Sequence, residues 1–166
     1  GALQTIRNVV VQDNHASGVT LVGRGVSEGV SNHDNWIFGS TTLTWTGAVD
    51  TDWEDPSNWD LGIVPVDGDG IAEGDRVIIP GGGNQPVLSD HVRPYQLTLE
   101  SGATLSVGGY DLVVDDALYN DGTVYLEGTG GLVLTTPDLD SGTFVYQGDG
   151  AGGTIPWAAG GHPASF

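Results

Sequence analysis

Two short acidic stretches, DTDWED and VDGDG, hold the candidate metal ligands. These ligands are Asp50, Asp52, Asp55, Asp67 and Asp69. Calcium takes about six to eight hard oxygen ligands, and alternating carboxylates in a turn can supply them together with backbone carbonyls. The EF-hand order is absent, because the loop lacks its glycine and its final glutamate. One hypothesis is a Ca²⁺ site; the alternative is solvated turns whose Asp side chains accept backbone N–H bonds.

Three tryptophans, Trp45, Trp53 and Trp59, follow one another at spacings of 8 and 6 residues. In one interpretation they are buried and supply bulk that short Val and Leu strands lack. In the other they form an open platform on which sugar rings stack, which makes them the candidate carbohydrate-binding residues. We favour burial and keep the sugar platform as the alternative.

Groups for acid–base catalysis are sparse. The four histidines are scattered, and His33 beside Asp34 gives two side chains on opposite faces of a strand. Arg7 and Arg24 lie about one coil apart and could neutralise a substrate carboxylate. No P-loop is present, because the chain holds no lysine. We therefore assign no catalytic residue, although a polysaccharide lyase or glycoside hydrolase activity stays open.

These residues must be positioned by short strands that repeat. Leu97, Leu118 and Leu139 stand 21 residues apart, and each opens a similar run of alternating apolar residues punctuated by Gly, Asp or Asn. Aligning the runs puts three pairs on one wall and two pairs on another: Leu105/Val107, Val124/Leu126 and Phe144/Tyr146, then Leu112/Val114 and Leu132/Leu134. Strands this short close no core alone, so each repeat must pack on the next.

The charge and cysteine content of the chain exclude several kinds of partner and site. The chain has 166 residues, 28 glycines, no cysteine, and 22 acidic residues against four basic ones, a net charge of −18. So negative a surface repels nucleic acid and anionic membranes, and we predict neither nucleic-acid binding nor membrane insertion. A disulfide framework and a Cys-ligated metal are both excluded. The sequence starts at Gly1 and holds no methionine, as expected of a piece of a longer polypeptide.

The first 40 residues carry the loose text IRNVVVQDN…SGVTL. This text resembles the terminal coils of a right-handed parallel β-helix of the pectate-lyase-like kind. The resemblance covers roughly 35 residues of the sequence. It implies stacked coils at the N-terminus of the chain.

The segment from Leu43 to Ser89 is more distinctive. It resembles a W-x-D-P-x-N-W-x-x-G-x-V-P text that precedes solenoid repeats in large secreted bacterial surface proteins of the adhesin-like kind. The matching residues are Trp45, Trp53, Asp55, Pro56, Asn58, Trp59, Gly62, Pro65, Asp75, Val77, Ile79, Pro80 and Pro86. The resemblance implies a cap over the exposed strand edges of a solenoid, and a role in adhesion or surface display.

The sequence thus predicts an all-β fold, a right-handed parallel β-helix or β-solenoid with coils of about 20 residues, with a β-sandwich as alternative. The expected parts are terminal β-helix coils at 1–40, a Trp-rich capping segment at 41–90, and solenoid repeats with a tail at 91–166. We expect a non-catalytic extracellular or cell-surface module, structural or adhesive, with Ca²⁺ as a candidate ligand. A polysaccharide or a cell-surface protein is the expected partner. The alternative is a carbohydrate-binding module or a fragment of a polysaccharide-active enzyme.

Overall fold

The structure, a computed structural model, describes residues 5–7, 10–13, 15, 21–24, 28–31, 36–68, 74–127, 130–138 and 140–148. Within these ranges the chain is built from strands, and the only helical element is one 3-10 turn, η1 (Pro56–Asn58). No helix in the described part of the chain has the length and apolar character needed to span a bilayer. The predicted all-β class is confirmed.

The N-terminal strands form two small parallel sheets. One has the order β1-β3-β5 and the other pairs β2 with β4: β1 (Thr5–Arg7), β2 (Val10–Gln12), β3 (Leu21–Arg24), β4 (Glu28–Ser31) and β5 (Trp36–Phe38). The register places the Cα of Arg7 opposite that of Arg24. The two arginines are therefore one coil apart, as their spacing predicts.

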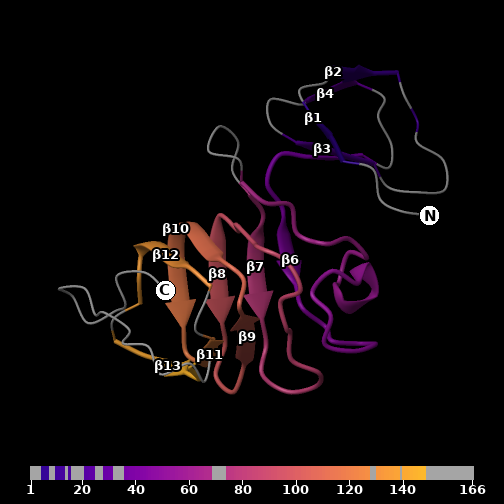
Figure 1. Cartoon of the computed structure of the whole chain (residues 1–166). Coiled ribbons are helices and arrows are strands. Elements are labelled where there is room, and N and C mark those ends of the chain that lie inside the picture. Colours follow the sequence, from indigo (N-terminus) through magenta and orange to yellow (C-terminus); the bar gives the residue numbers. More distant parts are fainter. Residues whose placement is uncertain are drawn as a thin grey trace.

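The remaining strands form the body of the protein, seen below the N-terminal strands in Figure 1. A five-stranded sheet has the order β12-β10-β8-β7-β6, and a three-stranded sheet has the order β13-β11-β9. Their bounds are β6 (Thr42–Thr44), β7 (Arg76–Ile79), β8 (Gln96–Leu99), β9 (Thr104–Gly108), β10 (Leu112–Asn120), β11 (Thr123–Leu126), β12 (Leu132–Thr136) and β13 (Thr143–Tyr146). β6 and β7, which come from the Trp-rich segment, thus lie in one sheet with strands of the repeats.

All strand pairs between these named elements are parallel. Successive turns of the chain place their strands side by side in the same positions. β10 pairs with β8 through Leu118 and with β12 through Leu112. A bridge from Val92 to Leu112 extends the second of these pairings by one coil. The body is a β-solenoid of about three turns, and the sandwich alternative is wrong because its strands would pair antiparallel.

The register confirms the repeat. Leu97 lies opposite Leu118 in neighbouring strands, whereas Leu139 lies outside the described residues. The first wall is formed as predicted, with Val124 between Leu105 and Phe144. The second wall is also formed, with Leu112 opposite Leu132 and Val114 opposite Leu134.

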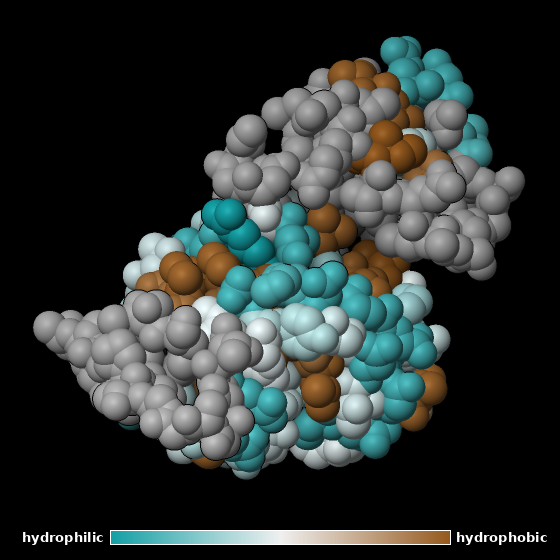
Figure 2. All heavy atoms as spheres, viewed as in Figure 1, coloured by the Kyte–Doolittle hydropathy of each residue, from teal (hydrophilic) through white to brown (hydrophobic). Residues whose placement is uncertain are grey.

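Alternation along the strands fills the interior with one side chain from each coil. Leu43, Val77, Leu97 and Leu118 are at most 2 % exposed and belong to one continuous core. Outward residues face water, and Figure 2 shows hydrophobic residues only in separate areas of the described surface in this view. Each coil buries its apolar residues only because its neighbours cover them, which is why the fold needs the repeat.

The coils approach so closely at one corner that only glycine fits. A Cβ on Gly122 would lie 2.4 Å from the carbonyl oxygen of Ala103 in the preceding coil. Gly142, one coil later, has a φ of +71°, and its Cβ would meet the Asn120 carbonyl oxygen at 2.1 Å. The glycine punctuation of the repeats is thus explained by backbone approach as well as by turn conformation.

Candidate functional site

The predicted metal ligands act as caps of tight turns. Asp50 Oδ1 accepts the backbone N–H of Asp52 at 2.9 Å, and Asp52 Oδ1 accepts that of Glu54 at 3.1 Å. Asp55 caps η1 by accepting the N–H of Ser57 at 2.8 Å. For Asp50, Asp52 and Asp55 this is the turn-capping role that was the alternative to Ca²⁺ binding. Asp67 instead accepts the N–H of Arg93, 26 residues further on, and Asp69 lies outside the described residues.

No group of three or more His, Asp or Glu side chains among the described residues is arranged to hold a metal ion. The bonds from Asp52 N–H and the Asn58 amide also hold the pKa of Asp50 below its usual range, so that carboxylate is satisfied by the protein itself. Calcium binding in this loop therefore stays a prediction, and no group of ligand side chains among the described residues supports it.

The three tryptophans pack on one another. Trp45, Trp53 and Trp59 are 3 %, 2 % and 3 % exposed. Trp59 lies edge-on to Trp45 and Trp53, with ring centroids 5.1 Å and 4.8 Å away. The indole N–H of Trp59 donates to the Trp53 carbonyl at 2.9 Å. The favoured burial is confirmed, and none of these three indoles offers an open face on which a sugar could stack.

Asn58 holds the loop around this cluster. It is fully buried, and its Oδ1 accepts the N–H groups of Val49 and Asp50 at 2.9 and 3.1 Å. Its Nδ2 donates to Asp50 Oδ1 at 2.7 Å and to the Asp52 carbonyl at 3.0 Å. All four hydrogen-bonding positions of the amide are used, so the polar group is buried without leaving an unsatisfied donor or acceptor.

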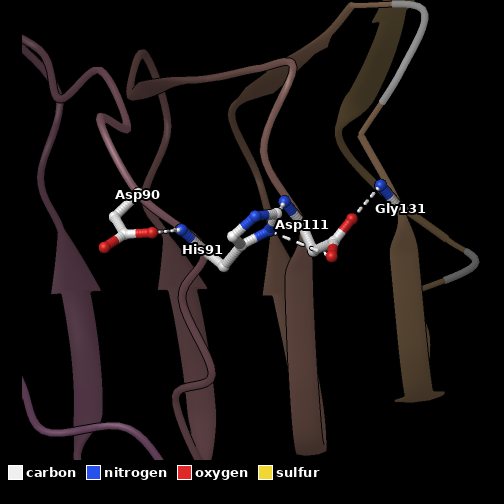
Figure 3. A network of polar contacts seen from close by, with 4 residues as sticks. All are labelled: Asp90, His91, Asp111 and Gly131. Carbon is white, nitrogen blue, oxygen red and sulfur yellow. Dashed lines mark hydrogen bonds and ion pairs between the residues drawn. The ribbon is translucent and has the colours of Figure 1, made fainter.

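A column of polar side chains at another corner joins three coils (Figure 3). His91 Nδ1 accepts the backbone N–H of Asp111 at 2.8 Å and lies 3.0 Å from Asp111 Oδ2. Asp111 Oδ1 accepts the N–H of Gly131 at 2.6 Å. The backbone N–H of His91 donates to Asp90 Oδ1 at 2.8 Å. Residues 91, 111 and 131 are each 20 apart, so the column follows the coil period.

His91 Nδ1 faces two groups of the next coil, the backbone N–H of Asp111 at 2.8 Å and Asp111 Oδ2 at 3.0 Å. As an acceptor, Nδ1 takes the N–H; as a donor, it bonds to the carboxylate. With either ring tautomer the contact joins two coils.

Further ties run between the same coils. Arg93 Nε donates to both oxygens of Asp115, at 2.8 and 3.0 Å, and Gln96 Nε2 donates to Asp116 Oδ2 at 2.6 Å. These pairs are separated by 22 and 20 residues in the sequence. Side chains that contact across one coil period stabilise the stack in the direction of its axis.

Glu54 lies among other carboxylates near the start of the body. Partial burial, and then the charges of Asp67, Asp90 and Asp52, raise its pKa. When the Glu54 carboxylate is ionised, the neighbouring carboxylates repel it. The stability of the first turn of the body should therefore depend on pH and salt.

The His91–Asp111 pair is not apparent from residues adjacent in the sequence. His33 and Asp34, the one adjacent His–carboxylate pair, lie outside the described residues. The signal was available, since the distance from His91 to Asp111 is one coil period. The side chains of Arg7 and Arg24 are not described, so a substrate role for them stays untested.

Comparison with known proteins gives one match. The sequence profile of a family described as Domain of unknown function (DUF8693) matches residues 44–151, more than half of the chain. The matched range begins in β6 and so spans the solenoid body. No curated protein and no solved structure matches the chain.

Proposed function

The chain belongs to the DUF8693 family, a domain of unknown function, and from this premise we propose that it is a non-catalytic extracellular module of a larger cell-surface protein. In this role the stacked coils act as a stiff spacer that displays an adhesive surface. The partner is a polysaccharide or another cell-surface protein.

One observation carries the proposal: a series of side-chain contacts in the body joins residues one coil apart. His91 to Asp111, Asp111 to Gly131 and Arg93 to Asp115 are the examples. These groups are occupied with each other and with backbone amides. They therefore support mechanical connection between coils better than they support proton transfer to a substrate.

Native-state hydrogen exchange on the full chain tests the spacer role. We expect the amides of β7, β8, β10 and β11 to exchange only through unfolding of the whole body, because each strand is buried between two others. His91→Ala should lower protection in β8 and β10, by about 0.5–1 kcal/mol for an exposed contact. His15→Ala, outside the body, should leave it unchanged.

Two results would overturn the proposal. Rapid local exchange of β8 or β10 in the unaltered protein would show that the coils open independently, so the stack could not act as a rigid spacer. Release of new sugar ends from any neutral or acidic polysaccharide would show that the module is catalytic.

A further inference from the structure

Asp75 carries a buried charge at the start of the body. It stands directly before β7 and is 0 % exposed, the only buried Asp or Glu among the described residues. Its Oδ1 accepts the backbone N–H of Thr41 at 2.7 Å, and its Oδ2 accepts that of Val66 at 2.8 Å. Burying a carboxylate is costly unless it is hydrogen-bonded, and here each oxygen bonds to a different segment. The charge therefore joins two parts of the chain to the start of β7.

The backbone around Asp75 joins the same segments a second time. The N–H of Asp75 donates to the Val66 carbonyl at 2.9 Å, and the N–H of Arg76 donates to the Thr41 carbonyl at 2.8 Å. The Asp75 carbonyl accepts the N–H of Tyr95, in the next coil, at 2.9 Å. Thr41 and Val66 are thus each held by two bonds, one of which goes to the carboxylate.

The Arg76 side chain extends this contact by one residue. Its Nη1 donates to Ser40 Oγ at 3.4 Å, and its guanidinium lies 4.7 Å from the centroid of the Tyr95 ring. Residues 39–41 are the whole connection between β5 and β6. Two of these three residues are therefore bonded to Asp75 or Arg76.

β6 is the strand that this contact supports. It is three residues long and ends the five-stranded sheet, with β7 as its neighbour in the strand order (Figure 1). On its other side Asp60 bonds to Thr44 through its N–H and its Oδ1, both at 3.0 Å. A short edge strand can open locally at a lower cost than a central strand. The carboxylate holds Thr41, the residue from which the preceding chain would pull β6 away.

We propose that Asp75 is a clamp that prevents β6 from being pulled off the body. Tension on the preceding part of the chain passes through Thr41 into β7, which is paired on both sides. The role needs a carboxylate, because an amide has one acceptor atom and would turn its amino group towards one of the two N–H groups. This inference goes beyond the proposed function and rests on the spacer role only for the source of the tension.

Single-molecule pulling on the full chain tests the clamp, because the direction of the load can be chosen. The chain has no cysteine, so two introduced cysteines define where the handles attach. Gly1→Cys with Gly148→Cys sends the load through residues 39–41. Val87→Cys with Gly148→Cys applies it at two exposed positions beyond the clamp.

Asp75→Asn should raise the opening rate of the body at fixed force about tenfold or more in the first geometry, since a hydrogen bond to a charged group is lost where the load acts. In the second geometry the rate should change less than about twofold. Asp60→Asn is the matched control, because it removes the same charge but keeps an oxygen that can accept the Thr44 N–H. It should change the rate less than about twofold in both geometries.

The outcomes separate the clamp from general stabilisation and from the spacer role. Equal acceleration in both geometries, or none in the first, would overturn the clamp. If Asp75→Asn does not fold, hydrogen exchange of the unaltered protein decides. We expect the Thr41 amide to exchange no faster than the amides of β6, and faster exchange would overturn the clamp. A body that still opens cooperatively in the second geometry would remain a spacer without a clamp.

Discussion

The two ends of the solenoid body treat their apolar residues differently. At the start, the Trp45–Trp53–Trp59 cluster is closed over by the loop that Asn58 fixes, and Asp60 pairs with the edge of β6 through the backbone of Thr44. At the other end, β12 and β13 are the last strands of their sheets within the described residues. Leu134, Phe144 and Tyr146 are only partly buried there.

Two buried asparagines show the same difference. Asn58 satisfies both its oxygen and its amino group, as described above. Asn120 is 1 % exposed, and its Oδ1 accepts the Gly122 N–H at 3.0 Å. Its Nδ2 finds no acceptor among the described residues. The comparison teaches that a solenoid end is stabilised by a dedicated segment with large rings and a saturated polar network, and that repetition alone does not provide one.

The largest effect is expected from the tryptophan cluster. Trp53→Ala should lower the free energy of unfolding by about 3–5 kcal/mol, because it removes a buried ring that packs against Trp59 and Trp45. Phe144→Ala at the other end should cost roughly half as much, since its ring is only partly buried. Urea unfolding followed by circular dichroism measures both. Equal losses would contradict the distinction between the two ends.

An intermediate effect is expected from the asparagines. Asn58→Ala removes four hydrogen bonds and leaves buried backbone groups unpaired, so it should destabilise the fold by about 2–3 kcal/mol. Asn120→Ala removes one bond together with an unsatisfied amino group, and should cost about 1 kcal/mol or less. The same unfolding experiment compares the two variants. If Asn120→Ala proved the more harmful, the account of the polar networks would be wrong.

The smallest effects concern pH, and they have opposite signs at the two ends. The Asn120 N–H, followed by bonds from Asp140, lowers the pKa of Asp138 from 3.8 to about 2. Because the unfolded chain then binds more protons, the stability due to Asp138 is present above pH 3.8 and is lost as the pH falls towards 2. For Glu54 the folded state holds the proton more tightly, so stability falls as pH rises past 4.5.

Unfolding free energies measured across this pH range separate the two contributions. Asp138→Asn should flatten the acid limb of the profile, and Glu54→Gln should raise stability at neutral pH. Asp55→Asn, a turn cap elsewhere in the first loop, serves as the control for loss of one charge. An unchanged acid limb in Asp138→Asn would show that this carboxylate does not stabilise the fold.

Much of the fold followed from the sequence because its signals are local and repeated. Apolar residues alternate within a strand, as Val124 and Leu126 do, and recur one coil later, as Leu112 does at Leu132. Parallel stacking places residues one coil apart in contact with each other. The buried tryptophans were also foreseen, since residues of that size seldom remain exposed beside so small a core. The sites were harder to predict, because Asp50 and Asp52 look the same in a sequence whether they bind a cation or cap a turn.

The sequence by itself determined the β-solenoid, its period of about 20 residues, the walls of the core and the unfavourable charge towards anionic partners. The tertiary structure decided which side chains meet across coils. It brought His91 to Asp111 and Arg93 to Asp115, and it used carboxylates of the first loop as caps. The physical reason is that periodicity fixes the inward and outward position of a residue, whereas its partner depends on how neighbouring coils are aligned.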